Sequence, residues 1–250
     1  MKPTIVRSSG AQAAGAAAAV PGRPPDVIAF KVWELPIRIS HWVMVASIVV
    51  LCVTGYMIGR PLFSAPTEAS KAYVHGTLRF VHYVAAWALT AAFGLRLYWG
   101  FAGNRFARWS RMFPVTRRRM RGLADDFMAL LFPRRAHRVY TGHAPLANLI
   151  YLSAYLGVII AIVTGSVHYA QSHYTPLWRW IAGFGLALFG NNLNIIHLVH
   201  HQTMWFFVVY AIGHVYMVSY TMVVSRTAEV DTMISGRKFI YTEDISPYDE

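Results

Sequence analysis

Four long apolar blocks constrain the fold of this chain more than any other feature of its sequence. They run near residues 40–59, 78–101, 146–170 and 196–224. Each contains about 20 residues or more, the length that a helix needs to cross a hydrocarbon core of about 30 Å. Only 14% of the 250 residues are charged, whereas a soluble domain carries roughly a quarter. The blocks therefore predict an all-α integral membrane protein built as a four-helix bundle.

The positive charge of the chain, formally +12, is concentrated in the connection between the second and third blocks. This connection contains a dense set of arginines: Arg105, Arg108, Arg111, Arg117, Arg118, Arg119, Arg121, Arg134, Arg135 and Arg138. Lys and Arg are enriched in cytoplasmic loops of membrane proteins. We therefore expect this connection and both termini to lie in the cytoplasm, with the arginines beside anionic lipid rather than nucleic acid.

The remaining segments suggest how the chain is organised. Residues 1–30 are rich in Ala, Gly and Pro and lack a continuous apolar core for a signal peptide, so we expect a disordered cytoplasmic tail. Residues 31–240 form the membrane domain, and residues 241–250 form a cytoplasmic C-terminal tail. Segment 171–194 is interrupted by glycines, and we expect it to form a short interfacial or partner-facing helix between the third and fourth spans.

The fourth block carries four histidines, although polar side chains inside a bilayer are costly and usually face a cavity, cofactor or partner. His200 and His214 are fourteen residues apart, so they lie within about 40° of one another and roughly 21 Å apart along a helix. His201 is about 140° and His197 about 100° from His214 on the same count. Helical phase therefore singles out His200 and His214, which need separate partners.

Two histidines on other blocks are at the matching depths. His41 lies at the start of the first block, at the cytoplasmic level expected for His214. His82 lies near the start of the second block, at the outer level expected for His200. Facing imidazoles from separate helices are the axial arrangement of a six-coordinate, non-covalent b-type haem. Because both axial positions would be filled, this arrangement predicts electron transfer, with no catalytic residue.

Four further residues are candidates for contact with such haems. Gly55 follows the first-block histidine by fourteen residues, where a glycine lets a flat macrocycle approach the helix. Arg96 follows the second-block histidine by the same interval, and it either binds a haem propionate or snorkels to the interface. Arg38 and Arg79 each lie three residues before a histidine and could reach propionates or lipid phosphate.

Other functions also fit parts of the sequence. His197, His200 and His201 have the spacing of three zinc ligands on a helix, but a zinc site would leave the other histidines unexplained. A histidine-lined metal or proton transporter and a haem-free membrane anchor remain open alternatives. Cys52 is the single cysteine, so no iron–sulfur cluster or thiolate site can form, and no CxxCH attaches haem covalently. The remaining histidines are expected to be interfacial, without chemistry: His75, His137, His143, His168 and His173.

Several motifs between about residues 33 and 240 together resemble a known family. They are RISHW (38–42), VTGYMIG (53–59), LRFVHY (78–83), RLYWGFAGNRFAR (96–108), TGHAPLAN (141–148), IVTGSVHYA (162–170), HLVHHQTMW (197–205), GHVYM (213–217) and TMISGRK (232–238). The chain resembles the b-type cytochrome subunit of membrane-bound nickel–iron hydrogenases, which is related to the gamma subunits of formate dehydrogenases.

The resemblance implies a four-helix subunit of the bacterial cytoplasmic membrane that holds two b haems. The ligand positions of the family map onto His41, His82, His200 and His214. Family members anchor the small and large hydrogenase subunits on the periplasmic side and pass electrons from iron–sulfur clusters to quinone. They do not split hydrogen themselves. A cytochrome of the formate dehydrogenase or thiosulfate reductase type is the alternative within the same class.

Overall fold

The computed structural model describes residues 27–60, 73–113, 116–131, 145–173, 175–224 and 229–241. Most of the predicted N-terminal tail, and all but the first residue of the predicted C-terminal tail, lie outside these residues. The chain divides into two compact units, each described by itself below. The four-helix unit comprises residues 39–97 and 151–214, and the terminal unit comprises residues 1–38, 98–150 and 215–250.

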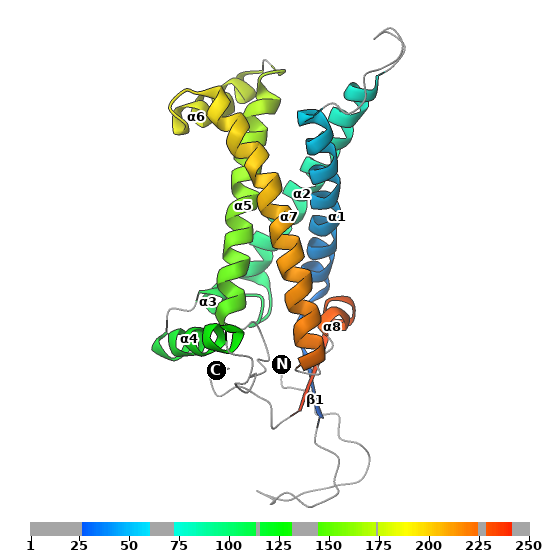
Figure 1. The fold of residues 1–250 in the computed structure, drawn as a ribbon, viewed down its shortest axis with the longest axis vertical. Helices are drawn as coiled ribbons and strands as arrows, with labels where there is room; N and C mark the ends of the chain where they lie inside the picture. The colour runs from blue at the N-terminus through cyan, green and yellow to red at the C-terminus, as the bar shows by residue number, and fades with distance from the viewer. Residues whose placement is uncertain are drawn as a thin grey trace, which may run out of the picture. The chain divides into compact units, whose positions relative to one another are not determined.

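Four helices are long and apolar enough to cross a membrane (Figure 1). They are α1 (Leu35–Gly59), α2 (Val74–Ala102), α5 (Pro145–Ala170) and α7 (Leu193–Val224). They confirm the predicted all-α membrane protein with four spans. Helices α1, α2 and α7 begin a few residues before the apolar blocks, because residues such as Arg38 and Asn194 are polar yet fit a first helical turn.

The core of the four-helix unit is small and apolar. It contains Leu89 and Phe93 of α2, Val158 of α5 and Phe207 of α7. Phe207 lies seven residues from both His200 and His214, so its burial turns the histidine-bearing face of α7 inward. Large apolar side chains on the other faces of the helices are exposed, as expected of surfaces that contact lipid.

A shorter helix, α6 (Pro176–Leu188), belongs to the same unit and lies within the segment predicted to hold one. Pro176 occupies the first turn, and the Thr175 hydroxyl accepts a hydrogen bond from the Trp178 amide at 3.5 Å. Gly185 is buried where a side chain would collide with Val167 of α5. The placement of α6 at an interface stays a prediction.

The terminal unit contains a two-stranded antiparallel sheet that the sequence did not predict. Strand β1 (Val27–Lys31) pairs with β2 (Arg237–Tyr241), in a register that places Phe30 opposite Lys238. The last residues of the expected tail 1–30 are therefore a strand. The pairing was missed because its two strands are about 200 residues apart and no local hairpin signal marks either one.

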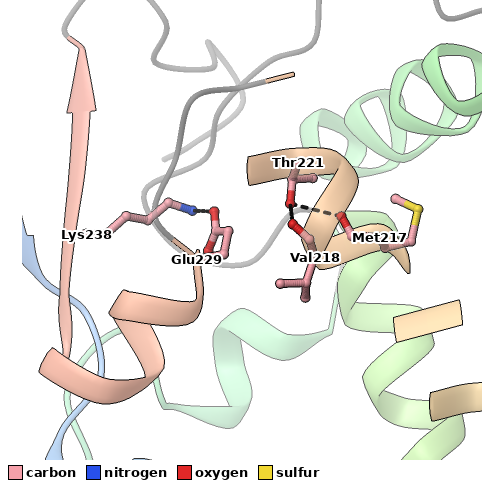
Figure 2. A network of polar contacts seen from close by, with 5 residues as sticks. All are labelled: Met217, Val218, Thr221, Glu229 and Lys238. Carbon is pink, nitrogen blue, oxygen red and sulfur yellow. Dashed lines mark hydrogen bonds and ion pairs between the residues drawn. The ribbon is translucent and has the colours of Figure 1, made fainter. Parts of the chain in front are cut away.

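Helix α8 (Glu229–Ser235) leads into β2. Lys238 of β2 forms an ion pair with Glu229 at 2.7 Å (Figure 2). Between helix and strand, Gly236 has a φ of +80°, and its carbonyl accepts hydrogen bonds from the amides of Val32 and Trp33. The turn at Gly236 thus joins the segment before α1 to the segment after α8.

The motif GNRFAR also contributes to the terminal unit. Asn104 donates a side-chain hydrogen bond to the Val32 carbonyl at 2.9 Å, and its backbone amide donates to Glu34 at 2.9 Å. The Trp99 indole donates to the same carboxylate oxygen at 2.8 Å. The arginine-rich connection contains two helices, α3 (Trp109–Met112) and α4 (Arg117–Leu131). The sequence pattern predicted only a connecting segment there.

Candidate functional site

The four-helix unit brings together the two histidine pairs that helical phase selected. The rings of His82 on α2 and His200 on α7 have centroids 6.3 Å apart, with planes inclined by 67°. The rings of His41 on α1 and His214 on α7 have centroids 6.4 Å apart, with planes inclined by 54°. The fourteen-residue interval between the two histidines of α7 separates the pairs by roughly 21 Å along that helix.

In the His82–His200 pair, a threonine hydroxyl lies beside the Nδ1 atom of each ring. Thr54 Oγ1 of α1 is 2.8 Å from His82 Nδ1, and Thr164 Oγ1 of α5 is 2.8 Å from His200 Nδ1. Both hydroxyls also donate a hydrogen bond to the carbonyl four residues earlier, at 2.7 Å and 2.6 Å.

These contacts favour one tautomer for both rings. A hydroxyl has one hydrogen, and here the helix backbone receives it, so each threonine accepts a hydrogen bond from the Nδ1–H of its histidine. In a neutral imidazole the other nitrogen, Nε2, then carries the free lone pair. Both histidines of this pair are thus prepared to bind a metal through Nε2.

The His41–His214 pair has different surroundings. His41 Nδ1 is buried without a hydrogen-bond partner among the described residues. The Trp42 ring meets the His41 ring edge-on at 5.1 Å, and the Tyr210 ring is nearly parallel to that of His214 at 6.0 Å. An aromatic ring therefore borders each histidine of this pair.

The predicted arginines are found in three different environments. Arg96 is only 5% exposed, and its guanidinium lies over the Tyr155 ring, 5.7 Å from Cζ to the ring centroid. Arg96 is thus enclosed by other side chains of the four-helix unit. Arg38 donates to the Ile234 carbonyl in the terminal unit. Arg79 is exposed on α2.

Gly55 is placed beside a predicted ligand. A Cβ atom built on it would lie 3.4 Å from His82 Cε1. A second glycine, which the sequence analysis did not select, has the same relation to the other ring: a Cβ atom on Gly165 would lie 3.1 Å from His200 Cε1. Both glycines leave room at the edge of an imidazole.

Among the described residues, the remaining histidines do not assemble a metal site. His197 and His201 line a hollow of about 290 Å³ together with Gly59, Arg60, Asn194 and Leu198. Within the described ranges, no group of three or more His, Cys, Asp or Glu side chains is arranged to hold a metal ion. The alternative zinc site of His197, His200 and His201 is therefore not formed. The ring of His200 faces that of His82, whereas the ring of His201 lies beside Gly59.

His168 was expected to be an interfacial histidine without chemistry, yet it lies inside α5 and close to the pair. Its ring centroid is 5.6 Å from that of His200 and 5.4 Å from that of His197. Its Nε2 atom is buried and has no hydrogen-bond partner in the described part of the chain. The sequence signal was its spacing, because it follows Thr164 by four residues and shares that helix face.

The two pairs fit six-coordinate haem iron. An iron atom bonded at about 2 Å to one nitrogen of each ring would hold the two ring centres roughly 6 Å apart. Both pairs match this separation, and in one pair the free Nε2 atoms are the donors that iron requires. His41, His82, His200 and His214 are therefore the residues that could hold two haems.

A known family and several named proteins are similar to this chain. Residues 32–236 match the model of the family described as prokaryotic cytochrome b561. The chain is similar to the "Probable Ni/Fe-hydrogenase B-type cytochrome subunit" of Azotobacter chroococcum mcd 1, with 37% identity over 83% of this chain and 88% of that protein. It is also similar to the "Probable Ni/Fe-hydrogenase 1 B-type cytochrome subunit" of Escherichia coli K12, with 33% identity over 84% of this chain and 91% of that protein.

Proposed function

Because the chain belongs to the prokaryotic cytochrome b561 family, we propose that it is the di-haem b-type cytochrome subunit of a membrane-bound nickel–iron hydrogenase. The names of its relatives support the hydrogenase assignment. The observation that carries the proposal is the presence of two facing histidine pairs, at 6.3 Å and 6.4 Å, on one inward face of α7. A single metal or proton site would need only one such pair.

The ligands of the outer haem are His82 and His200, and those of the inner haem are His41 and His214. Haem, when bound, supplies one-electron redox chemistry. The four imidazoles would hold each iron from both sides and leave no position for substrate, so the subunit would transfer electrons and the hydrogen-splitting chemistry would belong to its partner. Arg96 is buried at the level of the inner haem and is the strongest candidate for a propionate contact.

The proposed topology places the subunit in the bacterial cytoplasmic membrane with both termini and the arginine-rich connection inside. The density of arginine in that connection supports this orientation. The outer pair then faces the periplasmic hydrogenase, which the subunit anchors through its small and large subunits. The inner pair lies toward the cytoplasmic side, where electrons pass to the quinone pool.

Two measurements test this proposal. A pyridine haemochrome assay on the purified chain, with a dithionite-reduced minus oxidised spectrum, is expected to give two b haems per chain. A folded but colourless preparation would contradict it. Purification of the tagged chain from its native membrane is expected to recover nickel–iron hydrogenase subunits and hydrogen-dependent quinone reduction. Recovery of a formate dehydrogenase or thiosulfate reductase instead would keep the cytochrome and replace the partner.

A further inference from the structure

The tripeptide Val-Thr-Gly occurs twice in the four-helix unit, at residues 53–55 of α1 and residues 163–165 of α5. Its two copies make the same contacts with different histidines. Thr54 and Thr164 each lie 2.8 Å from the Nδ1 atom of a histidine on another helix. The glycine that follows each threonine leaves space at Cε1 of the same ring.

We propose that these two Val-Thr-Gly segments are matched supports for the axial ligands of the outer haem, and that Thr54 and Thr164 tune its reduction potential. They are positioning residues, since they act through the histidines and do not touch iron. This inference rests on the proposed function, which supplies the haem.

The tuning follows from the direction of the hydrogen bonds. Each hydroxyl donates to a backbone carbonyl and accepts from Nδ1–H, which fixes the ring orientation and leaves Nε2 for the metal. An acceptor on the far nitrogen makes the imidazole a more basic ligand. A more basic ligand stabilises ferric over ferrous iron, so both threonines lower the reduction potential of the outer haem.

The inner pair lacks this support on at least one side. His41 Nδ1 has no hydrogen-bond partner among the described residues, and the Trp42 ring lies nearly perpendicular to the His41 ring, with centroids 5.1 Å apart. The threonines therefore lower the potential of the outer haem relative to the inner one. Electrons move toward the higher potential, so this difference favours flow from the outer pair to the inner pair.

The test is a redox titration of the purified full-length chain carrying Thr54→Val, Thr164→Val or both. Valine keeps the shape of threonine and removes its hydroxyl. We expect each single variant to shift the midpoint potential of one haem to more positive values and to leave the other haem unchanged. A tenfold change in the ratio of ferric to ferrous affinity, at the low end for outer-shell partners, corresponds to about 59 mV.

Matched controls are available in the same unit. Thr90 donates to the Ala86 carbonyl at 2.8 Å and Thr203 donates to the Val199 carbonyl at 2.8 Å, the same backbone bond without a histidine. Thr90→Val and Thr203→Val are expected to shift neither potential. Thr54→Ser and Thr164→Ser, which retain the hydroxyl, are expected to keep the wild-type potentials. Repeating the titration in a His41→Ala background identifies the outer haem.

The outcomes separate the two proposals. Unchanged potentials in Thr54→Val and Thr164→Val, with both haems retained, would overturn the tuning role while leaving the di-haem cytochrome intact. Absence of haem from the wild-type chain would instead refute the proposed function. If a valine variant loses one haem, haem content becomes the measurement: retention in the serine variant and in Thr90→Val supports the inference, and equal loss in these controls overturns it.

Discussion

The imidazole of His200 faces that of His82, with ring centroids 6.3 Å apart, although His201 is next to it in the chain and faces elsewhere. This divergence makes a direct prediction. His200→Ala is expected to lower haem content from two per chain to one, because iron loses an axial ligand. His201→Ala is expected to retain both haems. The pyridine haemochrome assay measures both variants.

The same assay distinguishes the two pairs. His41→Ala and His214→Ala are each expected to remove one haem, and combining either with His200→Ala should remove both. Loss of haem in His201→Ala with retention in His200→Ala would show that His201, rather than His200, is the ligand on α7.

His168 provides a second prediction. Its ring centroid lies 5.6 Å from that of His200, whereas the centroid of His82 lies 6.3 Å away. Proximity alone would make it a rival ligand. However, the Thr164 hydroxyl fixes the Nδ1–H of His200, and the facing partner of that ring on α2 is His82. We therefore expect His168→Ala to keep two haems, whereas His82→Ala retains one. Two haems in His82→Ala and one in His168→Ala would show that His168, rather than His82, is the ligand opposite His200.

The sequence was sufficient to predict the spans and the histidine pairs, because both depend on simple periodicities. A run of about 20 apolar residues predicts a span, and fourteen residues return a helix to nearly the same face. His41, His82, His200 and His214 could be paired from phase and depth alone. No contact between distant segments had to be known.

What the sequence did not predict depends on contacts between segments that are distant in the chain. The pairing of β1 with β2 joins segments near opposite ends of the chain. The hydrogen bonds of Thr54 and Thr164 to histidines on other helices require a knowledge of how those helices face one another. The repeated Val-Thr-Gly was visible in the sequence, but the contacts that its two copies make with histidines were not.

The two glycines beside the His82–His200 pair predict unequal effects of added methyl groups. A Cβ atom on Gly165 would lie 3.1 Å from His200 Cε1, tighter than ordinary contact, whereas one on Gly55 would lie 3.4 Å from His82 Cε1. Gly165→Ala must displace its histidine ring, so we expect lower haem occupancy or a shifted haem spectrum. Gly55→Ala is expected to have the smaller effect.

A matched control for these variants is Gly94→Ala in α2, where no atom other than the adjacent residues and the backbone of the same helix lies within 4 Å of the new methyl group. It should leave haem content and spectrum unchanged. A larger effect of Gly55→Ala than of Gly165→Ala would indicate that the haem itself approaches Gly55, as the sequence analysis predicted.

Arg96 makes a prediction about the inner haem. Arg96 as a residue is only 5% exposed. A buried positive charge near a haem favours the reduced state, because reduction adds a negative charge. Arg96→Gln is therefore expected to shift the potential of the inner haem to more negative values, and Arg96→Lys to shift it less. Arg179→Gln, which removes an exposed charge on α6, is the control. A shift confined to the outer haem would contradict the placement of Arg96 at the inner level.

Gly236 makes a prediction about stability that involves no haem. Its φ of +80° is a region that residues with a side chain rarely adopt, and a Cβ atom there would collide with the Trp33 carbonyl. Gly190 also has a positive φ, +62°, but no atom lies within 4 Å of its Cβ position. Gly190→Ala therefore carries only the backbone cost, about 1–2 kcal/mol, and Gly236→Ala carries that cost and a steric one. Thermal unfolding in detergent should show a larger fall in Tm for Gly236→Ala, and equal falls would mean that the turn before β2 yields to the added methyl group.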